Sequence, residues 1–457
     1  MNNNSLLIRI LYFIITVLVI SSPALINGYP ILYLDSHNYI SQSISLQAEQ
    51  TTPIGYGLFI RAFSWQASLW PVVFAQSLLV SLLLFFTIRS LRVFKNLYIL
   101  HFASVVFLTM FTAMGYVFSQ IMADFFAPVL ILSVYLLFAK NSGIAIKIFA
   151  FSCIAFSSMT HFSLQILLLA LVIILPFLYK LASSYSLRSF LTRVSLLLIA
   201  FLLGFGINYA FYYSKYQNDT KGGVRHVIIM GRLVETGILD EYLNNNCDDH
   251  RYALCDYKGQ FPRRLTEFVW EENSPFYETG GWNNSAEEYN EIIYNVFTSP
   301  YYLGIFAYKG FISGFRQLVC FKTGIIKVYP ESKPNNAIKN NFPHEYKELL
   351  RSKQRYYDNT LADVNYAYYI LVSFSLIMIM AYLLLRPDVA ANLKNMILMI
   401  MLGVFLNGML TGAIAGTVHR FQARVNWLLV FIGLMIGFML FKELMSYLKK
   451  HEIPPKN

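Results

Sequence analysis

The amino-acid sequence predicts an all-helical membrane protein with about ten transmembrane helices. Of its 457 residues, 56% are hydrophobic and 13% are charged, whereas soluble domains carry roughly 25% charged residues. The apolar residues gather in runs of about twenty, the length that one helix needs to cross a bilayer. The basic residues between these runs are unevenly distributed, and this asymmetry predicts an orientation in the membrane.

Ten apolar runs are the candidate transmembrane helices. They cover residues 5–27, 67–88, 97–117, 119–138, 144–159, 162–180, 189–213, 363–386, 394–415 and 425–445. A cleaved signal peptide is the alternative for the first run, because "SSPALING" offers small residues near a possible cleavage site. We favour retention, since removing this run would spoil the sorting of charges.

The charges between the runs place both termini in the cytoplasm. With Met1 on that side, 15 Lys and Arg and three acidic residues are cytoplasmic, a net charge of +12. The other side then has a net charge of −1, so the whole formal excess of +11 lies on one face, as the positive-inside rule requires. Nucleic acid is not needed as a partner. We expect a bacterial inner-membrane protein with its large loop in the periplasm.

The runs divide the chain into three blocks. Residues 1–213 form a seven-span module, residues 214–362 an extracytoplasmic domain, and residues 363–457 a three-span module. In the first outer loop, "SHNYISQSISLQAEQ" and "IGYGLFIRAFSWQ" each predict a short helix in the plane of the interface. An ordinary re-entrant or disordered loop is the alternative.

The four cysteines are too few for a disulfide scaffold or a multi-cysteine metal site. Cys247 and Cys255 enclose "DDHRYAL" in the outer segment, where a local disulfide is expected. A pair of free thiols is the alternative. Cys153 and Cys320 lie in apolar runs and are expected to contribute to packing.

Ionisable residues at or inside the membrane are costly and are therefore functional candidates by default. In the predicted topology, segments distant in sequence bring such residues to the outer face. They are Asp35, Arg61, Asp124, His161, His419, Arg420 and Arg424.

The segment "HRFQAR" places His419, Arg420 and Arg424 on the side that positive charge normally avoids. Arg420 and Arg424 are four residues apart, so on a helix they face the same way. Two guanidinium groups in this arrangement suit a lipid phosphate or diphosphate. The alternative is that they snorkel to ordinary head groups.

Asp35 beside such a phosphate suits two roles, general base for an incoming hydroxyl or amine, or ligand of a metal ion. A divalent cation, Mg or Mn, shared with Asp124 would neutralise the leaving phosphate. Each residue also has a structural interpretation. Asp35 suits a cap of the following helix, Asp124 suits a helix dipole, and His161 suits packing.

The first 213 residues resemble the GT-C membrane glycosyltransferases, closest to protein O-mannosyltransferases and lipid A aminoarabinose transferases (glycosyltransferase family 39). The resemblance rests on "YLDSHNYI", on "TTPIGYGLFIRAF" and on "SQIMADFFAPVLILSVYLLFA". Seven spans before a large outer segment also match that family. Several relatives have Asp-Glu where this chain has Asp35-Ser36, a departure that bears on any metal in this loop.

The resemblance implies an enzyme that moves a sugar from a polyprenyl-phosphate carrier to a glycan, lipid or protein acceptor, with inversion. It makes Asp35 the catalytic carboxylate, and it assigns Arg420 and Arg424 to the donor phosphate by role and side. From their shared membrane face we also expect Asp124 and His161 at the catalytic site, and His419 and Arg61 at the donor phosphate. The alternatives are a lipid-linked glycan flippase, or a surface-glycan polymerase or ligase with a diphosphate-linked donor.

Overall fold

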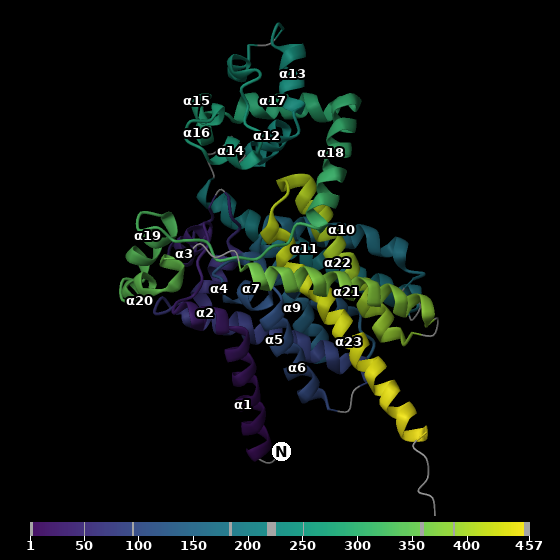
Figure 1. Ribbon diagram of the computed structural model, residues 1–457. Coiled ribbons are helices and arrows are strands. Elements are labelled where there is room, and N and C mark those ends of the chain that lie inside the picture. Colours follow the sequence, from purple (N-terminus) through teal and green to yellow (C-terminus); the bar gives the residue numbers. More distant parts are fainter. Residues whose placement is uncertain are drawn as a thin grey trace, which may run out of the picture.

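The computed structural model describes residues 3–49, 51–93, 96–181, 185–216, 225–249, 251–356, 361–386 and 389–451. Over these ranges the chain is helical and has no named strand, and an isolated bridge joins Ile31 and Gln120. The predicted all-helical class is therefore confirmed. A bundle of helices forms the larger part, and a smaller helical lobe stands on one end of it (Figure 1).

The first part of the bundle is formed by the helices before residue 216. They are α1 (Asn3–Ile20), α2 (Ser22–Asn27), α3 (Ser36–Ser45), α4 (Gly55–Ser64), α5 (Trp70–Leu91), α6 (Leu97–Phe111), α7 (Met114–Ser119), η1 (Ala123–Phe125), α8 (Phe126–Phe138), α9 (Ile144–Thr160), α10 (Phe162–Ile174), η2 (Leu175–Leu178) and α11 (Leu187–Lys215). Helices satisfy their backbone hydrogen bonds internally, as a lipid environment requires. Residues 28–66 form two short helices, α3 and α4, as expected. Their apolar residues, among them Ile40 and Ile60, are however buried in the core of the bundle, so the two helices pack as part of the protein and do not turn these side chains to lipid.

Three helices complete the bundle after the lobe: α21 (Ala362–Leu385), α22 (Ala391–Ala415) and α23 (His419–His451). In the described part of the chain, α5, α11, α21, α22 and α23 are long and apolar enough to cross a membrane. Shorter apolar helices cover Leu6–Ile20, Leu97–Phe111, Ala123–Phe138, Ile144–Thr160 and Phe162–Leu178. The chain therefore has the features of an integral membrane protein, and every predicted span overlaps one of these ten helices.

Two predicted spans are interrupted in the structure. Run 5–27 divides at Ser21, and Pro23 then lies in the first turn of α2, where its missing N–H costs no hydrogen bond. Run 97–117 divides at Thr112, whose backbone is extended, with φ −135° and ψ 179°. The hydroxyl of Thr112 accepts from the backbone N–H of Met114, 3.2 Å away. Threonine side chains that bond nearby backbone compete in this way with helix continuation.

The lobe contains α12 (Arg225–Glu235), α13 (Ile238–Asn246), η3 (Ala253–Tyr257), α14 (Leu265–Trp270), α15 (Pro275–Glu278), α16 (Gly281–Asn284) and α17 (Ala286–Thr298). Its buried residues form a core of their own that runs from Val227 to Tyr302. Helix α18 (Pro300–Leu318) leads from the lobe back to the bundle and packs on α22 (Figure 1). The two helices approach closely, because a Cβ on Gly412 would lie 2.5 Å from the carbonyl oxygen of Ser313.

Residues that follow α18 belong to the bundle and not to the lobe. Phe321, Val328, Phe342 and Leu349 are buried in the same core as the transmembrane helices. This stretch contains α19 (Lys333–Asn341), α20 (Tyr346–Arg351) and η4 (Lys353–Arg355) and packs against α3. The predicted outer segment 214–362 is therefore divided between two cores.

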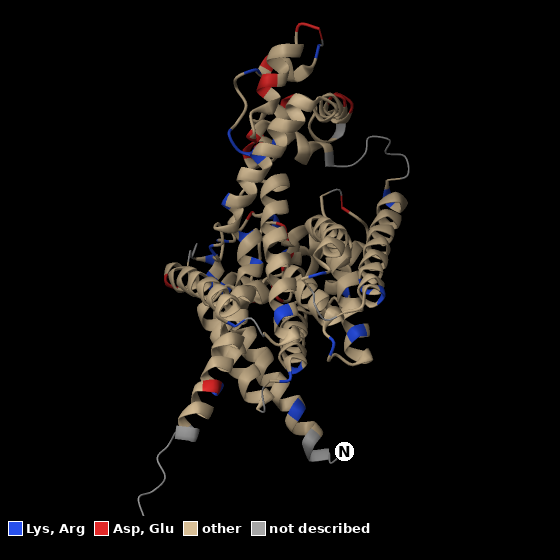
Figure 2. Cartoon of the chain, turned by 90° about the vertical axis from the view of Figure 1, so that its right-hand side faces the viewer, with Lys and Arg blue, Asp and Glu red and all other residues tan. Residues whose placement is uncertain are grey.

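Helix ends with basic residues meet at the end of the bundle opposite the lobe, which we call the basic end. There the side-chain amides of Asn141 and Asn392 both donate to the carbonyl oxygen of Ser90, at 3.3 and 2.9 Å. Lys442 donates to the carbonyl oxygen of Val93 at 2.7 Å. Figure 2 shows mainly Lys and Arg around this end, where the N-terminus lies, whereas the lobe contains Asp and Glu together with further Lys and Arg. The arrangement agrees with the sorting of charges along the sequence.

Candidate functional site

Two aspartates and two arginines, distant in sequence, meet at the end of the bundle that faces the lobe. Oδ2 of Asp35 lies 2.9 Å from Nη2 of Arg420, and Oδ1 of Asp124 lies 2.8 Å from Nη1 of Arg424. Nε of Arg420 lies 3.9 Å from Oδ2 of Asp124, which joins the two pairs. We call these four residues the quartet. Their formal charges cancel.

The first outer loop is fastened to the segment before Asp124, which explains why the two aspartates are neighbours. The N–H of Ile31 donates to the carbonyl oxygen of Ser119 at 3.0 Å, and the N–H of Ile121 donates back to Ile31 at 2.9 Å. The hydroxyl of Ser36 donates to Ile121 at 2.8 Å. Asp35 and Asp124 therefore follow two segments that these hydrogen bonds hold side by side.

Neither aspartate serves as a helix cap. Asp35 occupies the N-cap position of α3 but makes no capping hydrogen bond, and the short helix η1 that contains Asp124 likewise has no side-chain cap. Both carboxylates instead face guanidinium groups of α23. The structure thus does not support the cap interpretation of Asp35, and it shows an ion pair with Arg420 instead.

Arg424 is fixed from several sides. Only 1% of its side chain is exposed, and 6% of that of Asp124. Its Nη2 donates to the amide oxygen of Asn407 at 2.9 Å and to the hydroxyl of Ser163 at 3.1 Å. A buried ion pair is tolerated only when further hydrogen bonds satisfy its polar atoms. Ser163 of α10 and Asn407 of α22 supply two such bonds to Arg424.

His161 supports the network from the start of α10. Its Nδ1 accepts from the backbone N–H of Ser163 at 3.1 Å and lies 2.8 Å from the hydroxyl of that residue. Burial lowers the pKa of His161 to about 4, and the charge of Arg424 acts in the same direction. The imidazole is therefore neutral at pH 7 and can keep Nδ1 as an acceptor. The predicted site residue lies behind the quartet and positions it.

A cavity of about 420 Å³ opens beside the quartet. Its charged and polar lining includes Asp124, Lys322, His419, Arg420 and Arg424. Arg420 is held over the ring of Tyr33, with 4.7 Å between its Cζ and the ring centroid. The charges of the quartet cancel, so Lys322 leaves a net positive charge at the cavity, which suits an anion.

Several buried atoms of the quartet have no hydrogen-bond partner among the described residues. They are Oδ2 of Asp124, Nε and Nη1 of Arg420, and Nε of Arg424. Charged donors and acceptors that are buried without partners are rare in folded proteins and call for a water or a ligand. Arg420, of which 22% of the side chain is exposed, is the arginine that can reach a molecule in the cavity.

His419 fixes the wall that carries Lys322. Its Nδ1 accepts from the backbone N–H of Lys322 at 3.1 Å and lies 3.1 Å from Sγ of Cys320. Arg61, by contrast, does not belong to the described lining of the cavity. Its Nη1 donates to the carbonyl oxygens of Ser43 and Ile44, at 3.1 and 3.3 Å, and so caps the end of α3. These contacts favour a structural role for Arg61.

Gln354, which the sequence did not single out, holds the loop that carries Asp35. Its side chain accepts from the N–H of Leu32 at 3.0 Å and donates to the carbonyl oxygens of Leu32 and Ile326. Its own backbone N–H donates to the amide oxygen of Asn27 at 2.8 Å. Only 1% of Gln354 is exposed. This one residue connects the first outer loop to the wall of the cavity.

The arrangement of the quartet bears on the predicted divalent ion. The guanidinium of Arg420 lies between the two carboxylates that would share a metal, at 2.9 Å from one and 3.9 Å from the other. No group of three or more His, Cys, Asp and Glu in the described ranges has metal-ligand geometry. The donor set does not fit a shared Mg or Mn, because a cationic side chain already takes that position.

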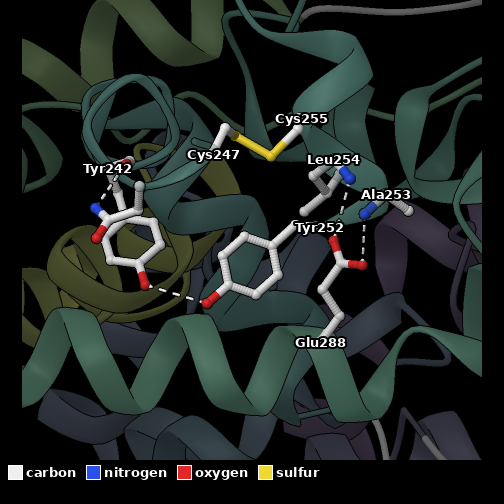
Figure 3. Close-up of a disulfide and its surroundings, with 8 residues drawn as sticks. Tyr242, Cys247, Tyr252, Ala253, Leu254, Cys255 and Glu288 are labelled. Atoms are coloured by element: carbon white, nitrogen blue, oxygen red, sulfur yellow. Dashed lines mark hydrogen bonds between the residues drawn. A yellow bond between two sulfur atoms is a disulfide. The ribbon is translucent and has the colours of Figure 1, made fainter. Parts of the chain in front are cut away.

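The lobe contains the predicted disulfide. Cys247 and Cys255 are bonded, with 5.9 Å between their Cα atoms, within the usual range of about 4.4–6.8 Å. Figure 3 shows the loop that they close and the carboxylate of Glu288, which accepts from the N–H groups of Ala253 and Leu254 at 2.8 and 3.1 Å. The bond stabilises the lobe and does not reach the quartet.

The described chain is all-helical, has the long apolar helices of an integral membrane protein, and has a charged cavity at the end of its bundle that faces the lobe. No protein-family model, curated protein or solved structure matches the chain. The argument for a function therefore depends on the residues of the site.

Proposed function

We propose that the chain is a membrane glycosyltransferase of the GT-C type, with ten spans and cytoplasmic termini. It transfers a sugar from a polyprenyl-phosphate carrier to a glycan, lipid or protein acceptor at the outer face, with inversion. The observation that carries the proposal is the partly open pair of Asp35 and Arg420 beside an anion-suited cavity. An acceptor base and a phosphate ligand are thereby held 2.9 Å apart.

In the proposed reaction Asp35 is the base. Its side chain is 38% exposed, so an acceptor hydroxyl can approach the carboxylate oxygen that Arg420 does not hold. Asp35 takes the hydroxyl proton as the acceptor oxygen bonds to the anomeric carbon. The bond from that carbon to the phosphate oxygen breaks, and its electron pair leaves with the carrier phosphate. A positioned base of this kind contributes about 10²–10⁴ in rate.

Arg420 and Lys322 then stabilise the leaving phosphate. Arg420 and Lys322 both line the cavity, and 22% of the Arg420 side chain is exposed. Charge-assisted bonds to phosphate are among the strongest hydrogen bonds in proteins. Asp124, Arg424 and His161 do not touch the substrate in this scheme. They fix the position of Arg420, and no step requires a metal ion.

A flippase is the alternative from another class, and the burial of charge argues against it. Among the described residues, the buried Asp, Glu, Lys and Arg side chains are Asp124, Arg232, Glu345 and Arg424. None of them lies midway along a transmembrane helix, whereas charged residues on a transport path usually line the bundle interior. The cavity also suits a diphosphate-linked donor. Whether the carrier is a monophosphate or a diphosphate therefore decides between the proposed transferase and the polymerase or ligase.

Mass spectrometry of lipids that co-purify with the protein tests the proposal. We expect a polyprenyl phosphate or its glycosylated form to be retained by the wild type and largely lost from Arg420→Ala. Arg316→Ala is the matched control, because Arg316 is an exposed arginine of α18 near the same end of the bundle. A diphosphate carrier would favour the polymerase or ligase. Retention of bulk phospholipids alone would contradict the proposal.

A further inference from the structure

A second group of unneutralised cations lies at the basic end of the bundle, beside a groove of about 420 Å³. The groove runs between α9 and α11, with Leu137 of α8 at its base. Its apolar wall includes Phe151 and Leu196, and its cations are Lys147 and Arg193. This groove shares no lining residue with the cavity beside the quartet.

Arg193 is held in place by the protein. Its Nε donates to the carbonyl oxygen of Leu137 at 3.2 Å, and its Nη1 donates to the backbone carbonyl of Ser189 at 2.6 Å. Its guanidinium also lies over the ring of Tyr185, with 4.7 Å to the centroid. The remaining nitrogen, Nη2, has no hydrogen-bond partner in the part of the chain that the structure describes. The site therefore presents a positioned cationic donor.

Within the described residues, no carboxylate pairs with these cations. Lys147 and Arg193 line the same groove, and neither forms an ion pair with an Asp or Glu of the described residues. Lys140 lies close by, 5.4 Å from the centroid of the same Tyr185 ring. Like charges gathered without a counter-charge repel one another, and an anion between them removes that cost. The groove between Lys147 and Arg193 is the position that such an anion would take.

The surface around the groove indicates where the anion comes from. Ile144 is 74% exposed and Ile148 is 60% exposed, both on the α9 wall. In an integral membrane protein such side chains face lipid chains. Lys147 lies in the first turn of α9 and Arg193 in the second turn of α11, and basic pockets between transmembrane helices at the cytoplasmic side are typical binding sites for anionic lipids.

We propose that this groove binds one anionic phospholipid. Its phosphate lies between Lys147 and Arg193, and an acyl chain follows the apolar wall past Phe151 and Leu196. The lipid ties α9 to α11 at the basic end, and it has no part in sugar transfer. The inference rests on the cytoplasmic placement of the basic end in the proposed function, but it does not depend on the sugar-transfer reaction.

Native mass spectrometry of the full-length protein with defined lipids tests this site. With phosphatidylglycerol and phosphatidylcholine of the same acyl chains, we expect a one-to-one complex with phosphatidylglycerol. In the double variant Lys147→Gln/Arg193→Gln, binding should fall by about tenfold or more, because each basic residue near the head groups contributes to binding. The control is Arg188→Gln, an exposed arginine one turn away in α11.

Loss of the contacts of Arg193 could also loosen the fold, so a second variant fills the groove and keeps both charges. Leu196→Trp should weaken phosphatidylglycerol binding without removing a cation. Equal binding of the two lipids, or wild-type binding in both variants, would overturn the proposal. Inorganic phosphate that displaces the lipid at millimolar concentration would show an anion site without an acyl-chain site, and would overturn it too.

Discussion

The two halves of the quartet contain the same chemical pair in different surroundings. In the buried half, Arg424 and Asp124 have side chains that are 1% and 6% exposed. In the open half, Arg420 and Asp35 are 22% and 38% exposed. A buried pair that loses one partner leaves an uncompensated charge, whereas an open pair can exchange its partner for a substrate. We therefore assign a structural role to the buried half and the catalytic role to the open half.

The largest expected effect on stability follows from Arg424→Ala. This change leaves the carboxylate of Asp124 buried without its main counter-charge, which typically costs about 3–5 kcal/mol. The thermal unfolding temperature of the detergent-solubilised protein should fall clearly. The double variant Asp124→Asn/Arg424→Gln should recover much of the loss, because no buried charge is then left unpaired.

Arg420→Ala is the matched comparison for that measurement. Arg420 is more exposed, so its removal should change the unfolding temperature much less than Arg424→Ala. Equal losses in the two variants would remove the distinction between the halves.

Gln354→Ala tests whether Gln354 positions the loop that carries Asp35 of the open half. The change removes three side-chain hydrogen bonds to Leu32 and Ile326, and unsatisfied buried groups typically cost about 1–3 kcal/mol. We expect a lower kcat, since Asp35 is misplaced, with a smaller change in KM for the donor because Arg420 and Lys322 remain. Gln260→Ala in the lobe is the control. A pure loss of stability with normal kcat would show that Gln354 is only structural.

A further effect concerns the dependence of stability on pH. The pKa of His161 is about 4 in the folded protein and about 6.5 in an unfolded chain. The unfolded state therefore binds more protons between these values, and stability falls as the pH drops from about 6.5 towards 4. His161→Asn keeps an acceptor for Ser163 but does not titrate, so it should flatten this part of the profile. An unchanged profile would show that other groups govern it.

The sequence could predict the membrane class and the apolar helices, because both follow from hydropathy. It could also place Asp35, Asp124, His161 and Arg420 on one face, because the sorting of charges assigns each loop to a side of the membrane. The breaks at Ser21 and Thr112 could not be predicted, since they depend on local backbone bonding inside otherwise apolar runs.

The contacts of the site were also beyond the sequence. The sequence pattern is the same whether an arginine binds a carboxylate or a phosphate. Only the structure shows that Arg420 lies between the two aspartates. Gln354 carried no signal, because a single glutamine in a polar segment is typical of any loop. Arg61 was grouped with the site only because it lies on the same predicted side of the membrane. That placement does not fix its distance from the other site residues.

The most direct test compares Asp35→Asn with Asp124→Asn in one assay of sugar transfer and one of unfolding temperature. We predict that Asp35→Asn lowers transfer by about 10²–10⁴, with donor retention and unfolding temperature close to wild type. Asp124→Asn should lower the unfolding temperature as well, because Arg424 then remains buried without its counter-charge. Asp363→Asn, an exposed aspartate at the start of α21, is the control. Wild-type transfer in Asp35→Asn would contradict the assignment of chemistry to the open half.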